Sequence, residues 1–129
     1  PLLWGASVLA ARAARRVAES VRRTTGRAAL AADAEHLFPV LESTPTHDVF
    51  ADPFADPESA PRPSLVVFDD GFEEPQLRAT RSALLATAER RGVRVETVTS
   101  QADGEVARYA ALLATGQFAA TYLGLGFAD

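Results

Sequence analysis

The chain has 129 residues, of which 47% are hydrophobic and 23% charged, and its formal net charge is −4. This composition is typical of one globular domain, and the negative charge argues against a nucleic-acid-binding surface. The absence of cysteine excludes disulfides and thiolate metal sites, and the absence of lysine excludes Schiff-base and Walker-type chemistry. No stretch approaches the roughly 20 apolar residues of a membrane span. We therefore expect a cytoplasmic protein without a membrane or nucleic-acid partner.

The first third of the sequence alternates strand and helix patterns. We predict a strand over residues 2–4, a helix over residues 7–23, a short strand over residues 28–32 and one or two helical turns over residues 34–41. In the first helix, arginines share one arc and small apolar side chains share the other. Gly26 is placed to end this helix. The opening residues start inside a strand pattern, so we expect an upstream part of the protein.

Residues 42–63 have a different composition from the rest of the chain. The segment holds five prolines with acidic residues between them, and a short Phe-Ala-Asp-Pro duplication. Prolines and like charges oppose both helices and central strands. We predict a long, acidic, Pro-rich loop, which is either a mobile surface insertion or a functional segment.

The second half of the sequence returns to alternating elements. A continuous apolar run predicts a strand over residues 64–69 that is covered on both faces. We then predict a helix over residues 75–91, a strand over residues 93–99 and a last helical region over residues 104–123. Alternating strands and helices predict a three-layer α/β sandwich around a small parallel sheet.

Two segments are expected at the carboxyl edge of this sheet, where ligands bind in open α/β folds. One is Gly5-Ala6-Ser7, which joins the first strand to the N-terminus of the first helix. Ser7 is either an anion contact at this positive helix end or an ordinary N-cap. The other segment is Asp69-Asp70-Gly71. With Glu73 and Glu74 it forms a carboxylate cluster that suits Mg²⁺, or simply a turn before a helix.

The remaining candidates are a histidine and a basic helix face. Neither His36 nor His47 has metal-ligand spacing. His36 follows Glu35, and the two are either an acid–base pair or solvated helix residues. The arginine face of the first helix is either a solvated or interface surface, or a surface that recruits anions.

The chain resembles the C-terminal SIS domain of bifunctional phosphoglucose/phosphomannose isomerases. The resemblance spans nearly the whole chain and is carried by four segments: Pro1 to Ser7 with the Arg-rich helix after it, Leu65 to Asp70, Pro75 to Ser100, and Gly104 through Gly124. It implies one SIS domain over residues 1–129, preceded by an upstream SIS domain in a homodimer. It also implies interconversion of aldose and ketose 6-phosphates through a cis-enediol, without metal or organic cofactor.

The resemblance also implies site residues. The family's Asn-Glu-Asn-x-Lys motif falls on residues 23–27, so its base position holds Thr24 and its basic position Arg27. The family's Pro-Glu-x-x-His stretch falls around residues 34–39, where Glu35 matches and the His position holds Phe38 or Pro39. We therefore expect Glu35 and His36 as the proton-transfer candidates. The substrate-binding candidates are Gly5, Ser7, Thr24 and Arg27, with Ser7 touching phosphate or sugar hydroxyls.

Two alternatives to an isomerase stay open at this point. One is a non-catalytic sugar-phosphate-binding or assembly subunit that dimerises through the alanine-rich helix. The other is an unrelated flavodoxin-like binding module, although Gly5-Ala6-Ser7 offers few of the hydroxyl side chains that bind a flavin phosphate.

Overall fold

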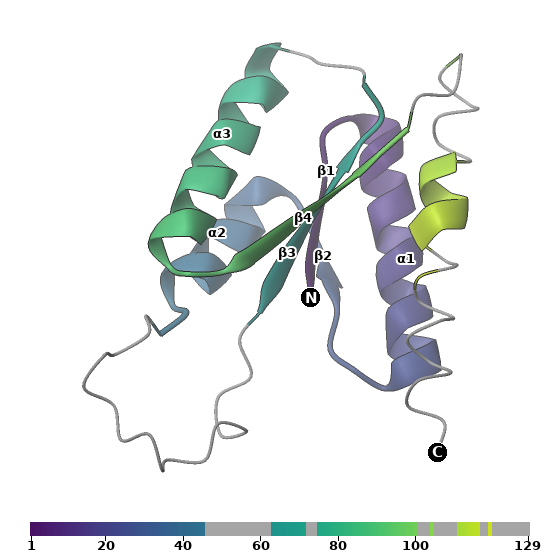
Figure 1. Cartoon of the computed structure of the whole chain (residues 1–129), viewed down its shortest axis with the longest axis horizontal. Helices are drawn as coiled ribbons and strands as arrows, with labels where there is room; N and C mark the ends of the chain where they lie inside the picture. Colours follow the sequence, from purple (N-terminus) through teal and green to yellow (C-terminus); the bar gives the residue numbers. More distant parts are fainter. Residues whose placement is uncertain (46–62, 72–74, 101–103, 105–110, 117–118, 120–129) are drawn as a thin grey trace.

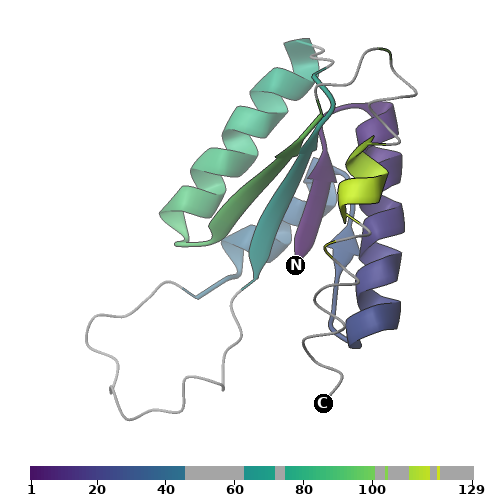
Figure 2. The same cartoon turned by 45° about the vertical axis from the view of Figure 1, so that its right-hand side comes forward.

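A computed structural model describes residues 1–45, 63–71, 75–100, 104, 111–116 and 119. Four parallel strands form one sheet in the order β2-β1-β3-β4. The strands are β1 (Leu2–Gly5), β2 (Leu30–Ala31), β3 (Ser64–Asp69) and β4 (Arg94–Thr99). Three helices, α1 (Val8–Thr25), α2 (Ala34–Glu42) and α3 (Pro75–Arg90), join them. Figures 1 and 2 show α1 on one face of the sheet and α2 with α3 on the other. The predicted three-layer α/β sandwich is confirmed.

The two central strands divide their side chains between the two faces. Leu3 and Phe68 point to the α1 side, whereas Trp4 and Val67 point to the α2 and α3 side. All four side chains are buried. A strand covered on both faces by helices reads as a continuous apolar run, which is why the sequence pattern located β3 correctly.

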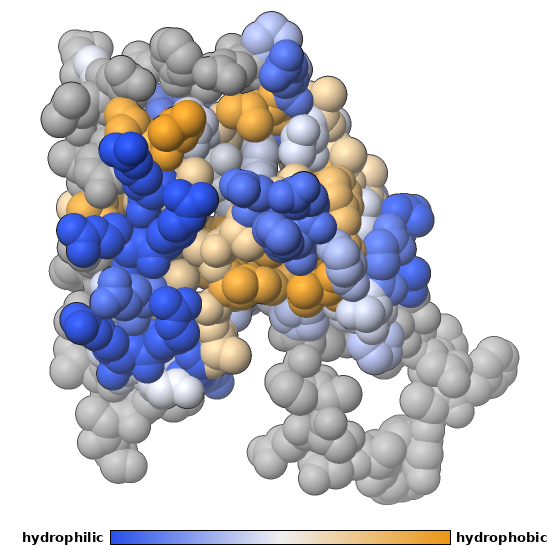
Figure 3. Space-filling view, turned by 180° about the vertical axis from the view of Figure 1, so that it is seen from behind, coloured by the Kyte–Doolittle hydropathy of each residue, from blue (hydrophilic) through white to orange (hydrophobic). Residues whose placement is uncertain are grey.

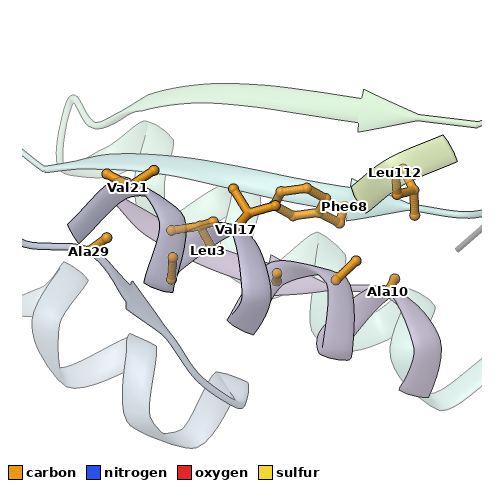
Figure 4. Close-up of a cluster of buried hydrophobic side chains, with 10 residues drawn as sticks. Leu3, Ala10, Val17, Val21, Ala29, Phe68 and Leu112 are labelled. Carbon is orange, nitrogen blue, oxygen red and sulfur yellow. The ribbon is translucent and has the colours of Figure 1, made fainter. Parts of the chain in front are cut away.

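The alanine-rich side of α1 packs closely on the sheet, as its periodicity predicted. Its buried residues are Ala10, Ala13, Ala14, Val17, Ala18 and Val21. Figure 4 shows Val17 beside Phe68, with Leu112 of the helical segment 111–116 at the other side of the ring. A Cβ on Gly116 would collide with Val17 Cγ2. The helical segment therefore packs against α1 through a position that has no side chain.

Two predicted boundaries need correction. The strand predicted over residues 28–32 contains only Leu30 and Ala31, because the chain turns directly after it into the N-cap of α2 at Asp33. The first helix runs to Thr25, two residues further than predicted. The predicted stop at Gly26 is confirmed, because Gly26 is the C-cap and its φ of 69° is left-handed. Most of the predicted acidic loop 42–63 and of the predicted helix 104–123 lies outside the described residues.

A pair of arginines joins the ends of α2 and α3. Arg90 Nη2 lies 3.1 Å from Glu42 Oε1, and Arg91 Nη2 lies 3.0 Å from Glu42 Oε2. The hydrogen bond from Arg91, with the positive charge of Arg90, holds the pKa of Glu42 below its ordinary value of 4.5. The two helices on this face are therefore connected by charge as well as by packing.

Because its pKa is lowered, Glu42 should contribute to the stability of the fold in a pH-dependent way. A carboxylate whose folded-state pKa is lowered contributes stability above its unfolded pKa, and that stability is lost as pH falls through the folded value. We expect wild type to have a small melting-temperature advantage over Glu42→Gln at pH 7, and this advantage should shrink as the pH falls below about 4.5. Thermal melts from pH 7 to pH 3 measure it. A difference that does not change with pH would contradict the assignment.

Candidate functional site

The junction between β1 and α1 lies at the carboxyl edge of the sheet and is tightly packed. Gly5, Ala6 and Ser7 are all buried. A Cβ on Gly5 would collide with the backbone of Ala10 and Ala11, so glycine lets the first turns of α1 cross directly over the strand end. The Ala6 amide donates to the Phe68 carbonyl at 2.9 Å, which ties the junction to β3.

Ser7 is the N-cap of α1. Its backbone is extended, and its Oγ accepts a 3.0 Å hydrogen bond from the Ala10 amide. Its carbonyl accepts the first helical hydrogen bond, from the Ala11 amide at 2.8 Å. Of the two roles considered for this residue, capping is the one these contacts show.

The Ser7 hydroxyl also contacts a carboxylate from the neighbouring strand. It donates to Asp70 Oδ2 at 2.6 Å, and Asp70 is only 1% exposed. Sequence analysis placed both segments at the same edge of the sheet but missed this contact. The contact could have been found from the strand order. If the strands that precede Ser7 and Asp70 are neighbours in a parallel sheet, the two residues that follow them lie side by side.

Asp69, at the same edge of the sheet, makes hydrogen bonds within the fold. Its carboxylate accepts from the Gly71 amide at 2.8 Å and from Arg81 Nη1 at 2.7 Å, and its carbonyl accepts from the Ser100 amide at 3.2 Å. Glu73 and Glu74 lie outside the described residues. Among the residues that the structure describes, no three acidic or histidine side chains gather as metal ligands.

Glu35 and His36 lie in the first turn of α2, just after the carboxyl end of β2. His36 Nε2 is 3.4 Å from Glu35 Oε1, and both side chains are mostly exposed, at 67% and 76%. The predicted acid–base pair is therefore brought together geometrically. It lies on the surface of this chain rather than in an enclosed site.

Thr24 and Arg27 lie at the opposite edge of the sheet. They stand at and just beyond the end of α1, whose 18 residues span about 27 Å at 1.5 Å per residue. Ser7 stands at the other end of the same helix. The candidate residues therefore fall into two groups, and Ser7 and Arg27 lie about a helix length apart.

The outer face of α1 presents a line of guanidinium groups. A hollow of about 340 Å³ is lined by Arg12, Arg15, Arg16 and Glu19. Arg15 lies 3.8 Å from Asp33, which connects this face to the start of α2. Figure 3 shows these hydrophilic side chains as a column along the helix. The face carries positive charge on a chain whose net charge is negative.

Comparison with known proteins gives one finding. The model of a family described as the bacterial phospho-glucose isomerase C-terminal SIS domain matches residues 1–126. No curated protein and no solved structure shows a significant match to the chain. No helix in the described ranges has both the length and the apolar character to cross a bilayer.

Proposed function

Because the chain belongs to the family of bacterial phosphoglucose isomerase C-terminal SIS domains, we propose that it binds an aldose or ketose 6-phosphate of the glucose, mannose or fructose type. The family match over residues 1–126 carries this proposal. The chain would act as one SIS domain, with an upstream SIS domain in a cytoplasmic homodimer. In the proposed reaction, proton transfer between C1 and C2 passes through a cis-enediol and uses no metal or organic cofactor.

The separation of the candidate residues supports a site shared between domains or subunits. Ser7, Glu35 and His36 follow strands or begin helices at the carboxyl edge, whereas Thr24 and Arg27 lie about a helix length away. A composite site would take each group from a different copy or domain. The exposed Glu35–His36 pair would then be covered by the neighbouring unit, and Arg27 would supply positive charge to another site.

In this proposal Ser7 contacts the substrate, and Gly5 allows the close packing that positions Ser7. The Ser7 hydroxyl gives its proton to Asp70 and accepts from the Ala10 amide, which leaves an oxygen lone pair but no donor for a phosphate oxygen. Between phosphate and sugar hydroxyls, the contacts favour a sugar hydroxyl as the Ser7 partner. Gly5 contributes by allowing the close approach of strand and helix that positions Ser7.

Deuterium exchange tests the proposed proton transfer. We expect the chain joined to its upstream SIS domain to incorporate deuterium from D₂O at C2 of the aldose formed from fructose 6-phosphate, as read by NMR. Glu35→Gln should slow this exchange by roughly 100-fold or more, because a general base contributes about that much. The control is Glu89→Gln, which makes the same change at an exposed residue of α3. Equal rates in Glu35→Gln and the control would remove Glu35 from catalysis.

A non-catalytic sugar-phosphate-binding subunit is the second candidate. It is favoured by Thr24 at the family's base position, because a hydroxyl cannot act as a general base near pH 7. In that case the same experiment gives no deuterium at C2, while fructose 6-phosphate still raises the melting temperature. The absence of both responses would contradict both candidates.

A further inference from the structure

The N-terminus of α1 already faces a buried negative charge from the protein itself. We propose that the Asp70 carboxylate takes the place of a bound anion at this helix end, so that the phosphoryl group of a sugar phosphate is excluded from the β1–α1 junction. Asp70 thereby acts as a specificity-determining residue. The exclusion of substrate phosphate rests on the proposed function, whereas the role of Asp70 as a counter-anion does not.

The hydrogen bonds at the junction support this role. Ser7 Oγ donates to Asp70 Oδ2 at 2.6 Å, a length typical of a charge-assisted O–H···O⁻ bond. The same oxygen accepts from the Ala10 amide at 3.0 Å. Ser7 therefore links the carboxylate to the helix N-terminus, and its only proton is already used.

The charge and burial of Asp70 also support its role as a counter-anion at the helix end. An acidic residue in the first turn stabilises the positive end of a helix, but α1 has none there. Asp70 supplies that charge from the end of β3, and at 1% exposure it is shielded from solvent. A phosphate entering the junction would meet this carboxylate in a region of low dielectric, where repulsion between like charges is strong.

Chemical rescue tests the counter-anion role. Asp70→Ala removes a carboxylate and leaves a space of the size of formate, so we expect its melting temperature to fall by about 10 °C. Sodium formate at ten times its Kd should restore about 5 °C, while sodium chloride at equal ionic strength should not. Asp70→Asn is the matched control, because its amide removes the charge but fills the space. Wild type and Asp70→Asn should show no specific response to formate.

The outcomes separate this inference from the proposed function. Equal formate responses in Asp70→Ala, Asp70→Asn and wild type would overturn the counter-anion role. If Asp70→Ala does not fold, Asp70→Asn decides: a melting temperature equal to wild type would overturn it, and a lower one supports it. Phosphate exclusion is tested on wild type with inorganic phosphate. Perturbed NMR amide signals at residues 5–9 would overturn exclusion, and unchanged signals support it whether or not the protein is an isomerase.

Discussion

Gly5→Ala is expected to destabilise the domain by about 3 kcal/mol, near the upper end for overpacked sites. The added Cβ would collide with the backbone of Ala10 and Ala11, which cannot rotate away as the tip of a flexible side chain can. The only relief is to move α1 off the sheet, and this would loosen the alanine face that packs there. Urea denaturation followed by circular dichroism measures the change in free energy of unfolding.

Gly26→Ala is the matched control for this prediction. Gly26 has φ of 69° and no neighbouring atom within 4 Å of an added Cβ, so its cost is conformational rather than steric. We expect about 1 kcal/mol, the usual penalty for an L-residue in the left-handed region. If both glycine variants lost the same stability, crowding at the strand end would not be what requires glycine at position 5.

Phe68→Ala is expected to cost about 3 to 5 kcal/mol, as is usual for truncating a buried aromatic ring. Phe68 is 1% exposed and belongs to the cluster formed by α1, the central strands and Leu112 (Figure 4). Losing the ring leaves a cavity between a helix and a sheet that are already in contact, so collapse can fill little of it. This is a large fraction of the 5 to 15 kcal/mol that stabilises a typical domain.

Hydrogen exchange tests which segments lose stability in Phe68→Ala. The amides of residues 111–116 should exchange faster in Phe68→Ala, because Leu112 loses its aromatic partner. Phe68→Leu keeps an apolar side chain at this position and should cost less than Phe68→Ala, because it leaves a smaller cavity. Unchanged exchange at residues 111–116 would mean that this segment does not depend on the Phe68 ring.

The sequence patterns that predicted the fold correctly are those that arise from burial of a single helix or strand. The apolar run of β3 and the alanine and arginine arcs of α1 follow from burial on one or two faces, so they can be read from sequence spacing. Boundaries were harder where a tertiary contact decides them. β2 pairs with β1 only at Leu30 and Ala31, and no periodicity in residues 28–32 encodes which of these residues find a partner on β1.

By itself, the sequence determined an all-parallel α/β domain of the SIS type and the two segments at its carboxyl edge, because alternating strand and helix patterns permit few arrangements. Only the tertiary structure decided how the candidate residues are grouped. It placed Thr24 and Arg27 a helix length from Ser7, and it joined Ser7 to Asp70, which is 63 positions away along the chain. Such pairings depend on strand order and on the direction of side chains at the strand ends, which hydrophobic spacing along the chain does not record.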